Sequence, residues 1–215
     1  MTSAATLDVL LQVLLHTCIC NSLNLIDITR LRATCKKMYR APVFTLTKLD
    51  CTWCEKLVLL PEKLMPNSLT TLDCSGCTSL VRLPDHLPNS LTTLDCSGCT
   101  SLVRLPDHLP NSLTTLLCSG CDSMVRLPAQ LPNCLTKLDC GLCDNLMILP
   151  SPLPGSLTTV ICSECKSLET LPSPLPGSLT TLNCSECESL ETLPSPLPSS
   201  LQQFSKQERD SGFGV

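Results

Sequence analysis

Polar and apolar residues alternate in a short segment that recurs along the chain. In Thr71–Ser75, Leu72 and Cys74 are separated by polar neighbours, and this two-residue period is typical of a strand with one buried face. Pro84 and Pro88 follow and exclude a continuous helix, so the chain must return by an extended or turn-like path. The leucines expected to point back into the core from this return are Leu80, Leu83 and Leu87.

The same 22-residue unit is repeated along most of the chain. Ser68–Asn89 and Ser90–Asn111 are identical, and an earlier copy from Thr45 has one extra residue near Met65. Looser copies begin at Ser112, Cys134, Ser156 and Ser178. A fixed period in the twenties indicates a stacked solenoid. A unit this short cannot bury its own apolar face, so each copy is stable only against its neighbours.

The segment Leu69–Leu80 reads LTTLDCSGCTSL, which resembles the leucine-rich-repeat pattern L-x-x-L-x-L-x-x-N/C-x-L. The resemblance covers about Phe44 to Phe204, and the LP-x-x-LP return is similar to the short repeats of secreted bacterial effectors and of amoebal and giant-virus proteins. It implies an α/β solenoid with short parallel strands on the concave face and mostly irregular or extended convex returns. The sequence departs from the family at Cys74 and its equivalents, where an aliphatic residue is usual.

This reading divides the chain into three parts. Residues 44–204 form the solenoid, with about seven 22-residue coils and a terminal cap, and residues 205–215 form a polar tail that we expect to be disordered. The cap is indicated by Lys206, which stands where an eighth coil would place a core cysteine. Residues 1–43 have a different pattern, with leucines at helical spacing, and predict a small α-helical N-terminal module.

The N-terminal module resembles an F-box, the helical module that docks onto the Skp-type adaptor of cullin–RING ubiquitin ligases. The second half carries the resemblance best, because a hydrophobic stretch leads into Cys35 and the basic pair Lys36 and Lys37. Asp8 stands where the family usually has proline. The resemblance implies adaptor contacts for Leu7, Leu10, Leu11, Leu14 and Leu25. The alternative is that these helices only cap the first coil.

Cysteine pairs with the spacing C-x-x-C occur in seven successive coils. They begin at Cys51, Cys74, Cys96, Cys118, Cys140, Cys162 and Cys184. Neighbouring pairs match a zinc-binding spacing. Both cysteine columns also coincide with core positions of the coil, where a free thiol behaves as a small hydrophobe. We therefore predict a buried ladder of free thiols with no metal or cofactor; a metal-loaded, redox-sensitive ladder is the competing interpretation.

Composition and charge narrow the possible functions. The net charge of −4, the scattered basic residues and an aromatic content of 2% argue against nucleic-acid binding. No apolar run reaches the roughly 18 residues that a membrane span requires, and the opening segment lacks the basic start of a signal peptide. We therefore expect a cytoplasmic protein without a membrane partner. Because three scattered histidines and identical coils do not build one special place, we expect no enzymatic activity.

The outward positions of the strands predict the target-binding surface. Large apolar residues inside a polar rim favour tight binding of a protein partner. The predicted contact residues are Trp53, Asp73, Asp95, Leu117, Asp139, Leu142, Ile161 and Glu164. Together with the F-box resemblance, this surface suggests a non-enzymatic substrate receptor of a cullin–RING ligase. The alternative is a free-standing binding, scaffold or decoy protein.

Overall fold

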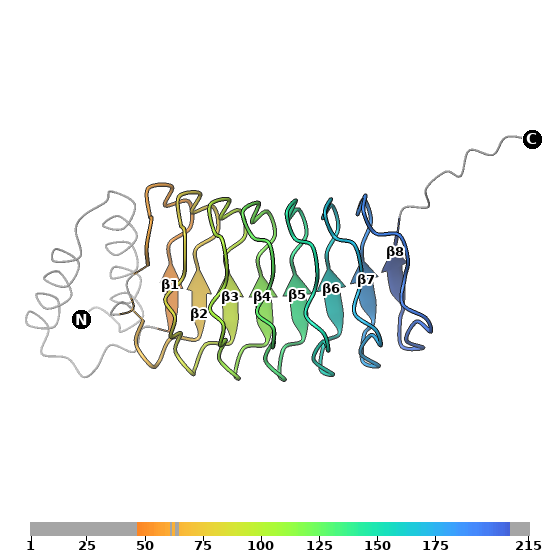
Figure 1. Ribbon diagram of the computed structural model, residues 1–215. Coiled ribbons are helices and arrows are strands. Elements are labelled where there is room, and N and C mark those ends of the chain that lie inside the picture. Colours follow the sequence, from red (N-terminus) through yellow and green to blue (C-terminus); the bar gives the residue numbers. More distant parts are fainter. Residues whose placement is uncertain (1–46, 61, 63–64, 207–215) are drawn as a thin grey trace, which may run out of the picture.

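A computed structural model describes residues 47–60, 62 and 65–206. They wind into a solenoid, and one side of this solenoid is an eight-stranded parallel sheet (Figure 1). Each coil contributes one strand, and the strands lie in the sheet in chain order. The strands are β1 Lys48–Asp50, β2 Thr71–Asp73, β3 Thr93–Asp95, β4 Thr115–Leu117, β5 Lys137–Asp139, β6 Thr159–Ile161, β7 Thr181–Asn183 and β8 Gln203–Ser205. The predicted parallel strands are therefore confirmed.

Each strand is shorter than the alternating segment of the sequence. β2 ends at Asp73, whereas the alternation continues to Ser75. Cys74 still donates its backbone N–H to the carbonyl of Asp95 at 2.8 Å, but the chain then enters a tight turn. The polar–apolar alternation therefore marks the strand together with the entry to its turn.

Equivalent residues of successive coils lie side by side. Leu72 of β2 pairs with Leu49 of β1 and with Leu94 of β3. The step from Lys48 to its partner Thr71 is one residue longer than the 22-residue step from Thr71 to Thr93. The first coil therefore contains the extra residue predicted from the sequence. Every position of the repeat thus forms a column that runs the length of the array.

The core consists of leucine and cysteine columns. The predicted inward residues of the second coil are all buried, from fully enclosed Leu72 and Cys74 to the three leucines of the return. No polar or charged residue is buried anywhere in the described part of the chain. The apolar columns therefore form one continuous core through the stacked coils.

Two rows of hydroxyl groups tie each coil to the preceding one. Thr92 Oγ1 donates to the carbonyl of Thr70 at 3.0 Å, and Ser90 Oγ donates to the carbonyl of Leu69 at 2.6 Å. The serine row is repeated at Ser112, Ser156, Ser178 and Ser200. Cys134 occupies the corresponding position of the fifth coil and is exposed.

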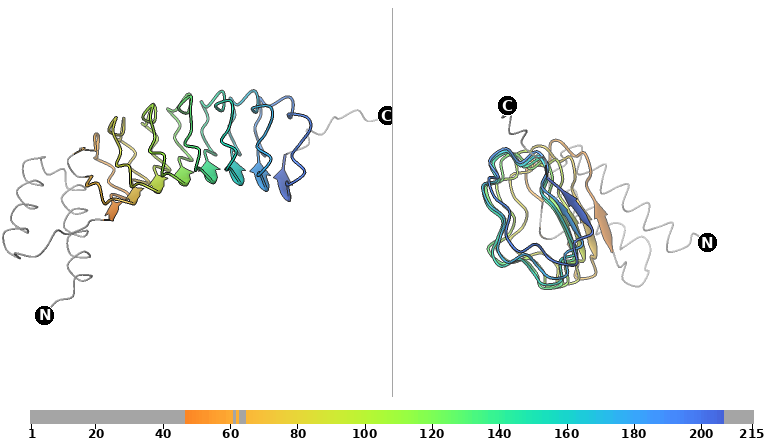
Figure 2. Two further views of the ribbon diagram at one scale, coloured as in Figure 1. Left: turned by 90° about the horizontal axis from the view of Figure 1, so that it is seen from below. Right: turned by 90° about the vertical axis from the view of Figure 1, so that its right-hand side faces the viewer.

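The array curves gently, with the strands on its inner side and the returns on its outer side (Figure 2). This agrees with the predicted concave strand face. The last strand, β8, is exposed along its whole length, and Phe204 retains 41% of its accessible surface. Ser205, expected in the tail, belongs to β8 because its carbonyl accepts the N–H of Cys184 at 2.9 Å.

The expected helical module at residues 1–43 lies outside the described residues, as does the tail beyond Lys206. The part of the chain that the structure describes contains no helix long and apolar enough to cross a membrane.

Candidate functional site

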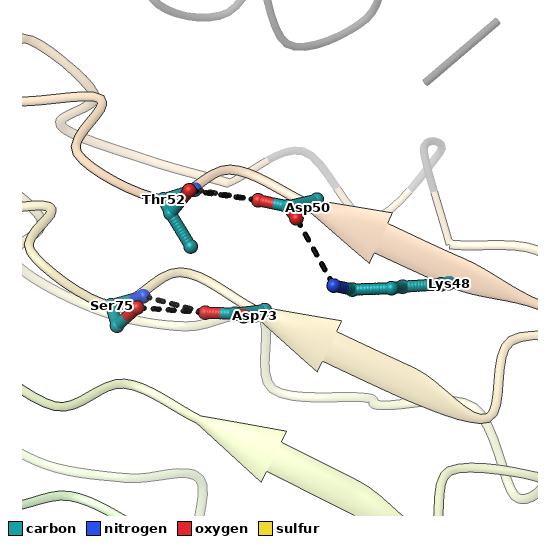
Figure 3. A network of polar contacts seen from close by, with 5 residues as sticks. All are labelled: Lys48, Asp50, Thr52, Asp73 and Ser75. Carbon is teal, nitrogen blue, oxygen red and sulfur yellow. Dashed lines mark hydrogen bonds and ion pairs between the residues drawn. The ribbon is translucent and has the colours of Figure 1, made fainter. Parts of the chain in front are cut away.

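The strand face carries a column of carboxylates that cap the turns behind the strands. Asp73 Oδ1 accepts hydrogen bonds from the backbone N–H of Ser75 at 3.2 Å and from its hydroxyl at 2.8 Å (Figure 3). Asp95 and Asp139 accept the N–H two residues ahead in the same way, at 2.9 and 3.3 Å. Short polar side chains often stabilise turns like this. These predicted contact residues therefore also have a structural role, which the recurring Asp-x-Ser pattern could have revealed.

The first carboxylate of this column is paired. Lys48 Nζ lies 3.1 Å from Asp50 Oδ2, and Thr52 donates to Asp50 Oδ1 through its N–H and its hydroxyl (Figure 3). Partial burial alone would raise the pKa of Asp50, but the hydrogen bonds from Thr52 and Lys48 outweigh burial and lower this pKa below its ordinary value. Asp50 is therefore charged at neutral pH and is held in place at the start of the array.

Leu117 and Ile161 interrupt the carboxylate column. Both are half-buried and occupy the position that Asp95 and Asp139 hold in neighbouring coils. Asp139 pairs with Leu117 on one side and with Ile161 on the other. The two apolar side chains therefore lie two strand spacings apart, about 10 Å, with a carboxylate between them.

The third residue after each of the strands β1 to β7 adopts the left-handed backbone conformation. It is glycine in three coils, with φ between 65° and 70°, and another residue in four coils, with φ between 56° and 58°. The column consists of Trp53, Gly76, Gly98, Gly120, Leu142, Glu164 and Glu186. Left-handed backbone costs most residues about 1–2 kcal/mol relative to the right-handed form. The column was visible in the sequence, but its backbone conformation was not predicted.

The three glycines form a strip of backbone between two large side chains, and two of them, Gly98 and Gly120, are partly exposed. Trp53 is 73% exposed, and its indole ring lies on Gly76 so closely that a Cβ there would stand 2.5 Å from Trp53 Cε3. A Cβ at Gly98 would meet only the backbone of Gly76, at 3.6 Å, so the next two positions stack without side chains. Leu142, 49% exposed, closes the far end. We call Trp53, Gly76, Gly98, Gly120 and Leu142 the glycine shelf.

The glycine shelf spans four coil steps, which corresponds to about 19 Å. Glu164 and Glu186 continue the same column beyond Leu142 and are exposed. The structure thus places the predicted residues Trp53, Leu142 and Glu164 in one row and the other predicted contact residues in the neighbouring strand column. An extended chain segment of about six residues would match the length of the shelf.

The cysteine columns are part of the core. The second thiol of each pair points at the backbone of the preceding coil; Cys99 Sγ, for example, donates to the carbonyl of Cys74 at 3.1 Å. Burial raises the pKa of both Cys77 and Cys165 to about 12, which keeps these thiols protonated at neutral pH. Cys54 is also buried, but its sulfur is disulfide-bonded, so the prediction of free thiols is wrong at this position.

The last thiol of the ladder differs from the others. Cys187 is only half-buried, and a hydrogen bond from the thiol of Cys162 lowers its pKa to about 7. Within residues 47–60, 62 and 65–206, no group of three or more His, Cys, Asp or Glu side chains is placed to hold a metal ion. The cysteine columns are buried and form part of the packed core.

The predicted adaptor contacts Leu7, Leu10, Leu11, Leu14 and Leu25 lie outside the described residues, so their arrangement stays a prediction.

No protein-family model matches the chain, and no curated protein sequence does. Among solved structures, the chain is similar to YopM from Yersinia enterocolitica, with 21% identity and a TM-score of 0.43 over 78% of this chain. It spans only 43% of the length of that protein. The leucine-rich repeat domain of the type III effector XopL is also similar, with 19% identity, a TM-score of 0.49 and 96% of each chain covered.

A leucine-rich repeat protein from Bacteroides ovatus shows a weaker similarity, with 18% identity and a TM-score of 0.33 over 75% of this chain and 61% of that chain. All these scores are low. The solenoid architecture therefore rests on the paired strands and buried columns of this chain.

Proposed function

We propose that this protein is a non-enzymatic interaction module that holds a protein partner on its strand side. The glycine shelf is the observation on which this proposal rests. The backbone at Gly98 and Gly120, which carries no side chains, allows the close approach of another chain, and Trp53 and Leu142 offer exposed apolar anchors at the two ends of the shelf. Large, well-placed apolar anchors contribute most of the affinity in protein interfaces.

The strand column beside the shelf suggests the charge of the partner. Asp73, Asp95 and Asp139 hold their carboxylates in fixed positions through hydrogen bonds to the turns. Leu117 and Ile161 add apolar contacts between these charges. A segment with basic residues around an apolar centre would complement this surface.

The finer proposal is that the protein is a substrate receptor of a cullin–RING ubiquitin ligase in the cytoplasm. It is supported by the F-box resemblance of residues 1–43 and would use Leu7, Leu10, Leu11, Leu14 and Leu25 to bind a Skp-type adaptor. The solenoid would then hold the target close to the partner enzyme, so that its contribution is proximity rather than chemistry. The second candidate is a free-standing scaffold or decoy whose N-terminal segment only caps the first coil.

Binding to a Skp-type adaptor separates these two candidates. The full chain and a variant without residues 1–41 are each mixed with a purified eukaryotic adaptor and separated by size-exclusion chromatography. Co-elution of the full chain alone would support the ligase receptor. If the full chain does not co-elute, the receptor proposal fails and the free-standing interaction protein remains.

The strand side is tested with substitutions that the fold already accepts. Leu117→Asp with Ile161→Asp introduces the residue that other coils carry at this position, and Trp53→Gly removes the exposed indole in the same way. We expect each variant to reduce the quantity of specifically captured partner by at least about tenfold, since anchors of this kind contribute about 2 kcal/mol or more. The matched control is His86→Ala with His108→Ala on the exposed returns. Equal capture by all variants would remove the strand side as the binding surface.

A further inference from the structure

An exposed apolar row runs along the returns. It consists of one residue in each of the first five coils. These residues and their exposed fractions are Val58 51%, Val81 42%, Val103 50%, Val125 47% and Met147 45%. We call this row the return stripe.

The backbone of the return stripe is hydrogen-bonded between coils in two parts, from Val58 to Val103 and from Val125 to Met147. The N–H of Val81 donates to the carbonyl of Val58 at 3.1 Å, that of Val103 to Val81 at 3.2 Å, and that of Met147 to Val125 at 3.3 Å. Neighbouring side chains are therefore about 5 Å apart. Single exposed valines are ordinary, but a contiguous apolar row of this length is typical of an interaction surface.

The side chains point outward because of the residues on either side of them. In the second coil, Leu80 and Leu83 are both buried, and the two residues between them, Val81 and Arg82, are exposed. Bridges join Arg82 to Leu59 and to Arg104, and Ile148 to Arg126 and to Thr170. These bridges hold the returns at strand spacing on both halves of the stripe.

Charge divides the surface around the stripe into two halves. Beside the stripe, coils two to four present Arg82, Arg104 and Arg126, all exposed. In the stripe column itself, coils six and seven carry exposed Glu169 and Glu191, and the N–H of Glu169 donates to the carbonyl of Met147 at 3.2 Å. The column beside the stripe is therefore basic in coils two to four, and the stripe column itself is apolar in coils one to five and acidic in coils six and seven.

Such a surface is complementary to itself when one copy is reversed. We propose that a second copy of this chain covers the return stripe around Val125 and Met147, in an antiparallel dimer with its two-fold axis between the fourth and fifth coils. Val125 of one copy then faces Met147 of the other, and Arg104 and Arg82 lie close to Glu169 and Glu191 of the second copy. A two-fold axis along the array would instead set each coil against its own equivalent and leave the arginines without carboxylates, so charge favours the antiparallel arrangement.

Arg104 also contacts Asp107 within its own coil, at 3.5 Å, but both side chains are largely exposed. An exposed pair of this kind contributes little and leaves the arginine free to meet a second copy. The dimer goes beyond the proposed partner binding, because it uses the returns and leaves the strand side open.

The test is sedimentation velocity of the full chain over a wide concentration range. We expect a reversible dimer whose Kd rises by at least about tenfold in Val125→Asp with Met147→Asp, since two charges enter the apolar centre. Circular dichroism should show an unchanged fold, because both side chains are half exposed in the monomer. Leu142→Asp, an equally exposed apolar position on the glycine shelf, is the matched control and should leave Kd unchanged.

Charge exchange tests the orientation. Arg104→Glu alone and Glu169→Arg alone should each weaken the dimer, and the two together should restore it toward the original Kd. A chain that is monomeric at every concentration, a dimer insensitive to the Val125 and Met147 substitutions, or a double charge exchange without recovery would each overturn the proposal. None of these results bears on capture by the strand side, so the two proposals fail separately.

Discussion

At the strand exits, one backbone conformation is shared by residues as different as glycine, tryptophan, leucine and glutamate. Gly98 has φ +69°, and a Cβ added there would make only ordinary contacts with Gly76. Any cost of a side chain at this position therefore comes from the backbone conformation and not from a clash. The column separates the two effects unusually well, because Gly76 would add a clash with Trp53.

We expect Gly98→Ala to lower the free energy of unfolding by about 1 kcal/mol, because alanine disfavours left-handed backbone. The loss is reduced in part by the smaller conformational freedom of alanine in the unfolded chain. Gly155→Ala is the control: Gly155 has ordinary φ and no atom within 4 Å of the added Cβ, so stability should be unchanged or slightly higher. Urea denaturation measures both. Equal effects would contradict the backbone explanation.

The buried thiols predict a loss of stability in alkali. Burial raises the pKa of Cys77 and Cys165 to about 12 and that of Cys184 to about 11, above the value of 9.0 for a free thiol. A raised folded-state pKa contributes stability that is complete below pH 9 and is lost as pH rises through the folded-state value. Cys187, with its pKa lowered to about 7, works in the opposite direction but is outnumbered.

We expect the unfolding free energy to rise slightly between pH 7 and 9, because the pKa of Cys187 is lowered, and to fall above pH 9 by about 1 kcal/mol per pH unit for each thiol whose pKa is raised. Urea titrations at successive pH values measure the slope. Cys165→Ala should show a shallower decline than the unmodified chain, because one buried thiol is removed. A slope that is the same in this variant would assign the alkaline loss to other groups.

At residue scale, the sequence predicted the inward cysteines because a 22-residue period makes every equivalent position share one environment. It did not predict the left-handed residue, since tryptophan and glutamate give no hint of positive φ. The signal lay in the glycines of the three related coils. It also left Asp73 as a contact residue only, because a hydrogen bond to Ser75 depends on how the turn closes.

Among the elements, the rows of serine and threonine hydroxyls make the coils more than a stack of apolar columns. Five serine hydroxyls reach the carbonyl of the leucine in the preceding coil, at 2.6 to 2.7 Å. The row is interrupted at Cys134. Its exposed thiol occupies the position from which a serine hydroxyl would donate to the carbonyl of Leu113. This is the weakest link that we identify in the serine row.

We expect Cys134→Ser to raise the free energy of unfolding by about 0.5–1.5 kcal/mol, the usual net contribution of one hydrogen bond. Thermal unfolding under reducing conditions measures the change. Ser112→Cys is the matched reverse substitution and should lower stability by a similar amount, because it removes the 2.7 Å bond to the carbonyl of Leu91. The explanation would be wrong if both substitutions shifted stability in the same direction.

Strands and returns were predictable from the sequence to different degrees. The strands followed from the alternation around Leu72, and their parallel order followed from the repeat. The return stripe was not predicted, because Val81 stands next to Leu80 in an apolar run that suggests burial for both. Val81 lies between Leu80 and Leu83, whose side chains are both buried, and its own side chain is directed outward.

For the whole molecule, the identical coils allow an unusually clean change of length. Deleting residues 68–89 joins Asn67 to Ser90, and the remaining coil has the same sequence as the one removed. We expect the shortened array to fold with a lower midpoint, and its denaturant m-value to fall by about one-seventh, in proportion to the surface exposed on unfolding. Urea unfolding measures both. An unchanged m-value would mean that this coil does not unfold with the others.

The two ends of the molecule were the parts least open to prediction. Lys206 suggested a terminal cap. In the structure, strand β8 pairs in register with β7 and is exposed along its whole length. A terminal coil has only one neighbour, so its apolar residues cannot be enclosed as in the middle coils. The F-box resemblance concerns residues 1–43, and only the adaptor experiment addresses it.

Contacts between strands join only consecutive coils, and this has a mechanical consequence. Each coil of 22 residues, the step from Thr71 to Thr93, advances the array by about 4.8 Å. The same residues reach about 75 Å when drawn out straight. Under tension applied at its two ends, the protein should therefore lengthen in steps of about 70 Å, as single coils unfold one after another from an end. The fully extended array would be many times longer than the folded one.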